Sequence, residues 1–142
     1  MAKTSNEIMK TPEETIREAA EAYISGDDEG LYRLLDHNVH MLGSEQHDNW
    51  DSRERSLARL GPELERRRTV ARSVSGSLVD RATTPDEVHQ SGDLAWWSGT
   101  GDLTVDGSYH RETSWTVVLS RKPDEESGGE WRIVHSHFSI HR

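Results

Sequence analysis

Residues 130–139 form the most strand-like stretch of the chain, and they read Glu130-Trp131-Arg132-Ile133-Val134-His135-Ser136-His137-Phe138-Ser139. Trp131, Ile133, Val134 and Phe138 in this stretch are β-branched or aromatic, the residue types that favour strands. Successive side chains of a strand point to opposite faces of a sheet, so Trp131 and Ile133 are expected to oppose Val134 and Phe138. We therefore predict a strand over 131–141 that carries large apolar groups on both faces.

Four further strand-like segments precede this one and predict a meandering sheet. They span residues 69–79, 87–90, 94–105 and 109–121 and are rich in Val, Thr and Trp. Turn sequences separate them, and the strongest hairpin signal among these turns is Asp106-Gly107.

The N-terminal part of the chain predicts helices. Thr11-Pro12-Glu13-Glu14 combines a capping hydroxyl, a proline at the first helical position and a glutamate that can bond back to the cap. Apolar residues then recur at spacings of three and four, and this helix is expected to end before Gly26. Asp27 or Asp28 can cap a second, shorter helix that carries Leu31, Leu34 and Leu35.

A short strand and a third helix are predicted next. Residues 39–42 read as the strand, and a polar loop over 43–49 leads to Trp50 and to a cap-like sequence at 51–54. The leucines at 57, 60 and 64 continue the helix, and Gly61-Pro62 is expected to kink or interrupt it.

Helices first and strands afterwards is the order expected of an α+β domain. We predict N-terminal helices packed in the concave face of a strongly curved, mostly antiparallel sheet. A length of 142 residues suits one continuous core. Residues 1–10 lack periodicity and are expected to form a flexible N-terminal arm, which leaves 11–142 as the domain.

Composition excludes several classes of partner and chemistry. A formal net charge of −9 disfavours nucleic acid and anionic membranes, because the field of the protein repels phosphates. The chain has no Cys, which rules out disulfides and thiolate chemistry. No apolar stretch approaches the length of a membrane span or a signal core, so a cytoplasmic location is expected.

Apolar groups on both faces of the sheet predict that its outer face is covered as well. Trp96 and Trp97 are neighbours and must also point to opposite sides. The helices cover the concave face, and the simplest cover for the convex face is a second copy of the chain. We therefore expect a homodimer through the convex sheet face; scattered surface aromatics are the alternative.

Three segments resemble the SnoaL-like family of the nuclear transport factor 2-like superfamily, namely 92–97, 111–119 and 130–139. The last, with its pattern Gly-x-Trp-x-Ile-Val-His-x-His-Phe-Ser, is also similar to the association domain of calcium/calmodulin-dependent protein kinase II. The resemblance covers nearly the whole chain and implies a cone-shaped, cystatin-like fold that opens at one end to a pocket and often dimerises through the outer sheet face. The superfamily includes ketosteroid isomerases, polyketide cyclases, dehydratases, epoxide hydrolases and proteins that only bind or assemble, so the fold leaves the function open.

The resemblance implies that a catalytic member would use a pocket carboxylate or His as general base, with a pKa shifted toward neutrality by an apolar cavity. Three weak candidates are His40, Asp48 and Glu112. Glu112 is the one carboxylate that stands alone among apolar strand residues, yet its neighbours by alternation, Ser114 and Thr116, equally indicate a solvated strand face.

His135 and His137 share one strand face at a spacing that could chelate a metal, with His110 and His141 available elsewhere. Two imidazoles on one strand seldom close a site without further ligands, and the resemblance places this pair on the structural signature of the sheet. We therefore predict no metal and no cofactor.

The residues expected to line a ligand pocket come from the last strand, from its neighbours and from the junction of loop and third helix. They are Trp50, Arg53, Trp96, Ser98, Thr113, Trp115, Ser136 and Phe138. The resemblance places Trp50 and Arg53 at the pocket mouth, although a solvated first-turn residue is the commoner role of such an Arg. It also matches Phe138 to an Arg of the kinase association domain, which argues against the same carboxylate-binding chemistry here.

Three functions remain open on the sequence. The first is binding of a small, largely apolar ligand in an aromatic-lined cone pocket, because aromatic walls with few polar groups are typical of small-molecule sites. The second is an isomerase, cyclase or hydratase that acts by general acid/base catalysis in that pocket. The third is a dimeric assembly module whose pocket is vestigial.

Overall fold

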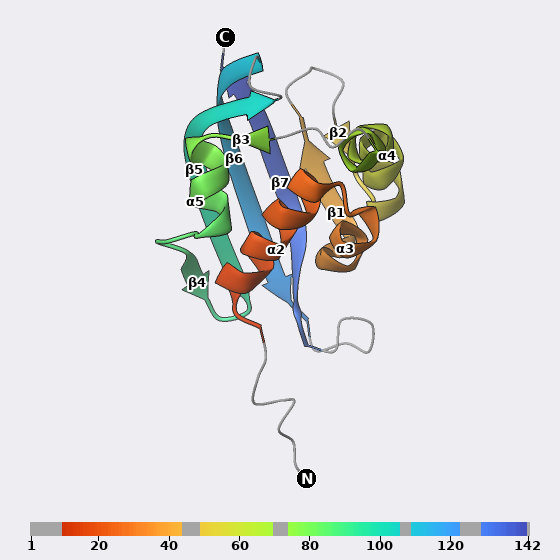
Figure 1. Ribbon diagram of the computed structural model, residues 1–142. Coiled ribbons are helices and arrows are strands. Elements are labelled where there is room, and N and C mark those ends of the chain that lie inside the picture. The colour runs from red at the N-terminus through yellow and green to blue at the C-terminus, as the bar shows by residue number, and fades with distance from the viewer. Residues whose placement is uncertain (1–9, 44–48, 70–73, 106–108, 123–128, 142) are drawn as a thin grey trace.

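Helices cover one face of a curved sheet in this computed structural model, which describes residues 10–43, 49–69, 74–105, 109–122 and 129–141 (Figure 1). Helix α2 (Pro12–Ser25) begins with the predicted capping box, in which Thr11 and Glu14 bond to each other's backbone N–H groups. It ends at Gly26, whose φ of 79° is the left-handed conformation that glycine adopts most readily. Asp27 caps helix α3 (Asp28–Leu34), so both N-terminal helices are confirmed.

Helix α4 (Arg53–Thr69) runs through Pro62 as one element, so Gly61-Pro62 does not interrupt it. Pro62 is exposed, and it costs the helix one backbone hydrogen bond. Packed residues lie on both sides of it: Leu60 contacts the core and Leu64 is fully buried. These tertiary contacts hold the helix together where local propensity alone predicts a break.

Helix α5 (Ser77–Thr83) overlaps the segment 69–79 that its Val and Thr content predicted to be a strand. Among the described residues of that segment, Val74–Ser75 (β3) form the strand. Gly76 adopts a φ of 120°, and a Cβ added to it would lie 2.2 Å from the carbonyl oxygen of Asp102. The Ser77 hydroxyl accepts a hydrogen bond from the Asp102 N–H at 2.8 Å. Leu78 and Ala82, four residues apart, are the buried positions of α5.

The sheet has the strand order β2-β1-β7-β6-β5-β3, and β4 pairs with β5. Its other strands are β1 (Leu35–Leu42), β2 (Asn49–Trp50), β4 (His89–Ser91), β5 (Leu94–Val105), β6 (Tyr109–Arg121) and β7 (Trp131–His141). The pairing of β1 with β7 is parallel and all the other pairings are antiparallel, which confirms a curved, mostly antiparallel sheet in an α+β fold. Strand β1 starts earlier than predicted, since Leu35 belongs to it and not to the second helix.

A β-bulge in β7 changes which side chains face the helices. Leu119 pairs with Ile133 but the next pair is Val118 with His135, so β7 has one extra residue at this point. Residues on both sides of the bulge therefore face the helices: Ile133 is buried before it and Ser136 after it. The prediction that Trp131 and Ile133 oppose Phe138 is wrong for this reason, because strict alternation stops at the bulge.

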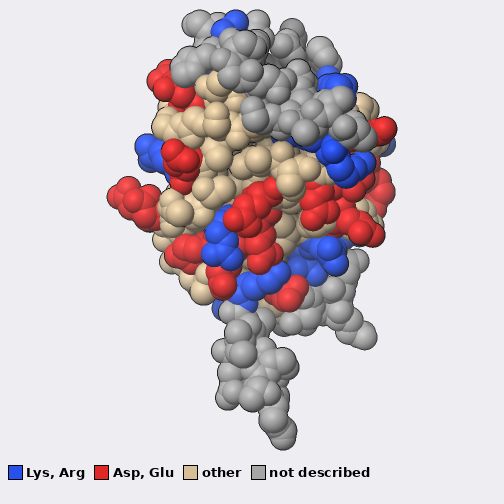
Figure 2. Space-filling model, viewed as in Figure 1, with Lys and Arg blue, Asp and Glu red and all other residues tan. Residues whose placement is uncertain are grey.

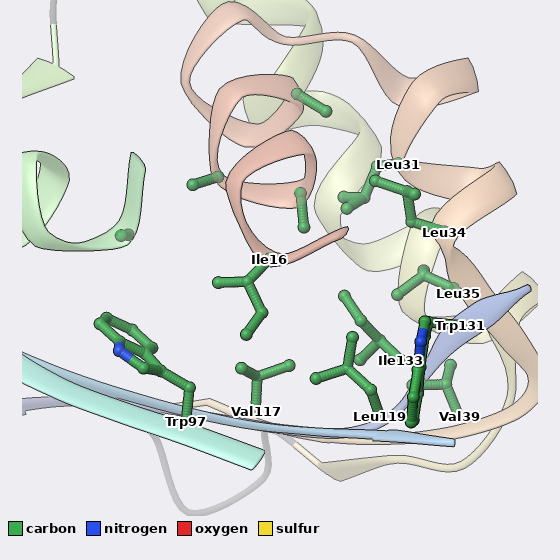
Figure 3. Close-up of a cluster of buried hydrophobic side chains, with 14 of the residues drawn as sticks. Ile16, Leu31, Leu34, Leu35, Val39, Trp97, Val117, Leu119, Trp131 and Ile133 are labelled. Carbon is green, nitrogen blue, oxygen red and sulfur yellow. The ribbon is translucent and has the colours of Figure 1, made fainter. Parts of the chain in front are cut away.

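The core lies between α2 and the concave face of the sheet. Figure 3 shows Trp97, Val117, Leu119 and Ile133 rising from the sheet toward Ile16 of α2. Leucines from α3, β1 and α4 complete the same buried cluster. Among the described helices, none combines the length and the apolar character that crossing a membrane requires.

Candidate functional site

The concave face extends beyond the core into a group of partly buried aromatic side chains, one of which bonds to a serine hydroxyl. Trp115 of β6 lies opposite Phe138 of β7, and its indole N–H donates a hydrogen bond of 2.9 Å to the Ser136 hydroxyl. The Trp115 ring contacts the Trp97 ring edge-on, with centroids 5.8 Å apart. The Phe138 ring lies 6.1 Å from that of Tyr23 on α2. We call Tyr23, Trp115, Ser136 and Phe138 the concave cluster.

A charged group ties this cluster to α4. The Arg67 guanidinium, on a residue that is 6% exposed, donates to the Tyr23 carbonyl at 2.9 Å, to the Tyr23 hydroxyl at 3.2 Å and to the Glu63 carboxylate at 2.5 Å. It also lies 4.0 Å above the Tyr23 ring. The Tyr23 hydroxyl donates to Glu63 at 3.0 Å. Arg67 thus donates a hydrogen bond to a backbone carbonyl in the last turn of α2, a turn that contains no basic residue of its own.

Burial raises the pKa of Tyr23 to about 12, with the Arg67 charge acting in the opposite direction. The phenol therefore stays protonated at neutral pH and acts as a hydrogen-bond donor. Its proton is already directed at Glu63, so the group formed by Tyr23, Glu63 and Arg67 is internally satisfied.

Four of the residues predicted to line the pocket do share the concave face, namely Thr113, Trp115, Ser136 and Phe138. Trp96 and Ser98 do not. Trp96 pairs with Val118, is 41% exposed and stacks on His89, while Ser98 bonds to Thr116. Both lie on the outer face, so the prediction that they share a face with Trp115 is wrong: Trp97, and not Trp96, points to the helices.

Trp50 and Arg53 lie at the edge of the sheet and at the start of α4. The Arg53 guanidinium sits 4.0 Å above the Tyr32 ring of α3 and its Nε lies 3.7 Å from the Glu54 carboxylate. This side chain therefore joins α3 to α4. Trp50 pairs with Met41, and the guanidinium of Arg59 lies 5.8 Å from its ring centroid.

The two general-base candidates that the structure describes, His40 and Glu112, do not lie in the concave cluster. Glu112 is exposed and pairs with Asp102, as a solvated strand face predicts. His40 is on β1 with its ring against His135, and Asp48 lies outside the described residues.

His135 pairs across strands with His40, while His137 is exposed. The Nδ1 atoms of His40 and His135 are 3.3 Å apart, and His40 Nε2 lies 2.8 Å from the amide oxygen of Asn49. Burial, followed by the charges of His40 and His137, lowers the pKa of His135. In the described part of the chain no three His, Asp or Glu side chains gather around a common point.

A separate surface groove of about 520 Å³ runs between α2, α3 and the start of β7. Charged side chains dominate it, and two of its pairs are neutralised: Lys10 with Glu18 at 2.8 Å, and Arg132 with Glu130 at 3.0 Å. Figure 2 shows acidic and basic side chains interspersed over the helices on this face. The groove contains none of the residues predicted to line the pocket.

The sequence from residue 13 to residue 142 matches the family model described as the SnoaL-like domain. The chain belongs to the SnoaL-like domain family. This confirms the resemblance seen in residues 92–97, 111–119 and 130–139. No curated protein matches this SnoaL-like domain.

Solved structures similar to this SnoaL-like domain have the nuclear transport factor 2-like fold. A proposed calcium/calmodulin-dependent protein kinase II association domain from Thiobacillus denitrificans aligns with a TM-score of 0.67 and 15% identity, over 95% of this chain and 98% of that one. A proposed dehydratase of the NTF2-like family from Streptomyces avermitilis gives 0.67 and 18%, over 90% and 91%. A proposed ketosteroid isomerase from Shewanella frigidimarina gives 0.58 and 18%, over 89% and 92%. At these identities the likeness shows the fold alone.

Sequence reasoning missed the charged part of the SnoaL-like domain's interior. Tyr23 is one of the residues that recur at spacings of three and four in the first helix, which predicts only that it faces the core, and Glu63 and Arg67 were not singled out. Their spacing of four residues on a helix is a signal for an ion pair, but such pairs are common on exposed helix faces. The sequence alone does not indicate that this pair lies against Tyr23.

Proposed function

We propose that this SnoaL-like domain binds a small, largely apolar molecule against the concave cluster. The observation that carries the proposal is a set of aromatic side chains, Tyr23, Phe138 and Trp115, on one face of the sheet, of which Trp115 bonds to the hydroxyl of Ser136, a residue that is 5% exposed. Small-molecule sites in proteins have this composition, with apolar walls and a few placed polar groups. The aromatic rings supply contact area at little cost in side-chain entropy.

Ser136 is the group proposed to orient the ligand. Its oxygen accepts the hydrogen bond from the Trp115 indole, and a hydroxyl retains one proton to donate. A carbonyl or ether oxygen of a ligand is the natural acceptor for that proton. The ligand class that suits the cluster is therefore an apolar ring system or chain with a single acceptor oxygen.

We expect the neutral naphthyl ketone prodan to bind the purified protein with a blue-shifted emission. Replacing Phe138 with alanine should weaken binding about tenfold or more, because it removes aromatic contact worth about 1.5–3 kcal/mol. Ser136→Ala should weaken it several-fold through the loss of one hydrogen bond worth about 1 kcal/mol. Fluorescence titration measures both dissociation constants.

Trp96→Ala is the matched control for this experiment, because Trp96 lies on the opposite face of the sheet. Its affinity for prodan should equal that of the unsubstituted protein. Equal weakening by Trp96→Ala and Phe138→Ala would place the probe elsewhere and remove the basis for the proposal.

Catalysis of an isomerase, cyclase or hydratase type is the alternative proposal for the same cluster. What supports it is the protonated Tyr23 hydroxyl, a possible donor to a developing oxyanion once a substrate displaces Glu63. Ligand binding ranks first because the Glu63 carboxylate, the acidic group in contact with the cluster, is ion-paired with Arg67.

We also propose that two copies pair through the outer face of the sheet, with the protein in the cytoplasm. Trp96 and Leu94 are 41% and 48% exposed on this face. Around them, hydroxyl pairs such as Ser98 with Thr116 form a surface of small side chains. If the concave cluster binds no ligand, this pairing would be the function of the domain, which is then an assembly module with a vestigial pocket.

Light scattering coupled to gel filtration should give the mass of a dimer. Trp96→Asp should weaken self-association at least tenfold, because burying an unpaired charge costs more than about 1.4 kcal/mol. Tyr32→Asp is the control, since Tyr32 is 38% exposed on α3 and away from the sheet. A monomeric mass for the unsubstituted protein, or equal effects of the two substitutions, would contradict pairing through this face.

A further inference from the structure

The pairing of β1 with β7 brings together two imidazoles that are 95 positions apart in the sequence. His40 and His135 are opposite each other in this parallel pair, and their Nδ1 atoms face each other at 3.3 Å. Their ring centroids are 5.3 Å apart and the rings are tilted by 31°, so they are not stacked face to face. Both side chains are partly exposed.

The separation of the two nitrogens equals the bite of a tetrahedral metal ion. Zn²⁺ binds imidazole nitrogen at about 2.0–2.1 Å, and two such bonds at the tetrahedral angle place their nitrogens about 3.3–3.4 Å apart. Two imidazoles with this nitrogen separation can bind one ion when their lone pairs converge on it, beside the line that joins the two nitrogens.

Asn49 prepares His40 for this role. The amide oxygen of Asn49 lies 2.8 Å from His40 Nε2, and an oxygen at this distance accepts the Nε2 proton. A neutral ring with its proton on Nε2 presents the lone pair of Nδ1 toward His135. Metal-binding histidines in proteins are commonly oriented in this way, through a hydrogen bond from the nitrogen that does not bind the metal.

We propose that His40 and His135 bind a divalent transition-metal ion through their Nδ1 atoms, with Asn49 holding His40 in position. Imidazole nitrogen suits Zn²⁺, Ni²⁺ and Cu²⁺. In the described part of the chain no third His, Asp or Glu joins the pair, so water completes the coordination. The site lies on the opposite side of the sheet from the concave cluster, and the proposal is independent of ligand binding there.

A hydrogen bond between the two rings is the competing account of the contact at 3.3 Å, with one Nδ1 donating its proton to the other. A nitrogen that binds a metal must be free of its proton, so protons and the metal compete for this site.

Titration of the purified protein with ZnCl₂, followed by calorimetry, distinguishes the two accounts. We expect one Zn²⁺ per chain, with binding abolished in His135→Ala and His40→Ala. Asn49→Ala should weaken binding about tenfold, as substitutions in the outer shell of metal sites do. His89→Ala is the control, because this ring stacks on Trp96 at another strand and should leave the affinity unchanged.

Imidazole ¹H–¹⁵N spectra identify the ligating atoms directly. On addition of Zn²⁺ the Nδ1 signals of His40 and His135 should shift, while the Nε2 signal of His40 keeps the frequency of a protonated nitrogen. His135→Gln, which retains a polar side chain, should fold normally and lose the His40 shift. Undetectable binding, equal affinity in His135→Ala, or shifts confined to other histidines would each overturn the proposal.

Discussion

Replacing Arg67 with alanine is expected to lower the free energy of unfolding by about 2–4 kcal/mol. The substitution removes three hydrogen bonds and leaves the Tyr23 carbonyl and the Glu63 carboxylate without their cation. The Glu63 side chain is 37% exposed, so water can solvate its carboxylate once Arg67 is gone. The loss of stability is therefore smaller than for a fully buried ion pair. Urea unfolding followed by circular dichroism measures the loss.

Arg66→Ala is the matched control, because Arg66 is the preceding residue of the same helix and is exposed. It should change stability by less than about 0.5 kcal/mol. Arg67→Lys should recover only part of the stability, since an ammonium group cannot reproduce the planar fork of donors. If the alanine variants at 66 and 67 unfold at the same urea concentration, the hydrogen bonds of Arg67 to Tyr23 and Glu63 do not stabilise the fold.

Gly26→Ala is the second substitution with a large expected effect, a loss of about 2 kcal/mol or more. A φ of 79° costs an L-residue about 1–2 kcal/mol. The added Cβ would also lie 2.3 Å from the carbonyl oxygen of Leu64, a backbone atom of α4 that cannot rotate away. The variant forces the end of α2 away from α4 at this contact, and thermal unfolding should show a lower Tm.

Gly92→Ala separates the two contributions. Gly92 also has a positive φ, of 61°, but no heavy atom lies within 4 Å of an added Cβ. This variant should lose only the backbone term of about 1 kcal/mol. Equal losses at Gly26 and Gly92 would show that the approach of the two helices tolerates a methyl group.

Most of the fold could be predicted because its decisive signals are local. The capping box at Thr11 and Glu14 and the glycine after Ser25 mark both ends of α2 within the sequence itself. The long strands β5, β6 and β7 follow from their β-branched and aromatic residues, and the helices precede them in the order typical of α+β folds.

The errors lie where distant residues decide the local conformation. Gly76 and Ser77 start a helix because the Asp102 backbone, 25 positions away from Ser77, lies against them. The bulge in β7 depends on how β6 is paired, and no residue type marks it. Since each strand face was assigned by alternation, one extra residue sufficed to misplace Trp131 and Ile133.

The candidate site was predicted in part for the same reason. Trp115, Ser136 and Phe138 could be placed on one face because they lie on the same side of the bulge in adjacent strands. Arg67 and Tyr23 meet across 44 positions, and His40 and His135 across 95. Such contacts come from the topology, and alternation or helical spacing within one element does not reveal them.

The place of β7 in the sheet has a consequence for biosynthesis. This strand lies between β1 and β6, so among the described strands β2, with two residues, is the one partner that β1 can find before β7 has been made. Contacts between residues this far apart in the sequence form late in folding, and the unpaired strand edges stay exposed until then. The edges of β1 and β6 that face β7 therefore remain open to unwanted strand pairing until β7 inserts between them.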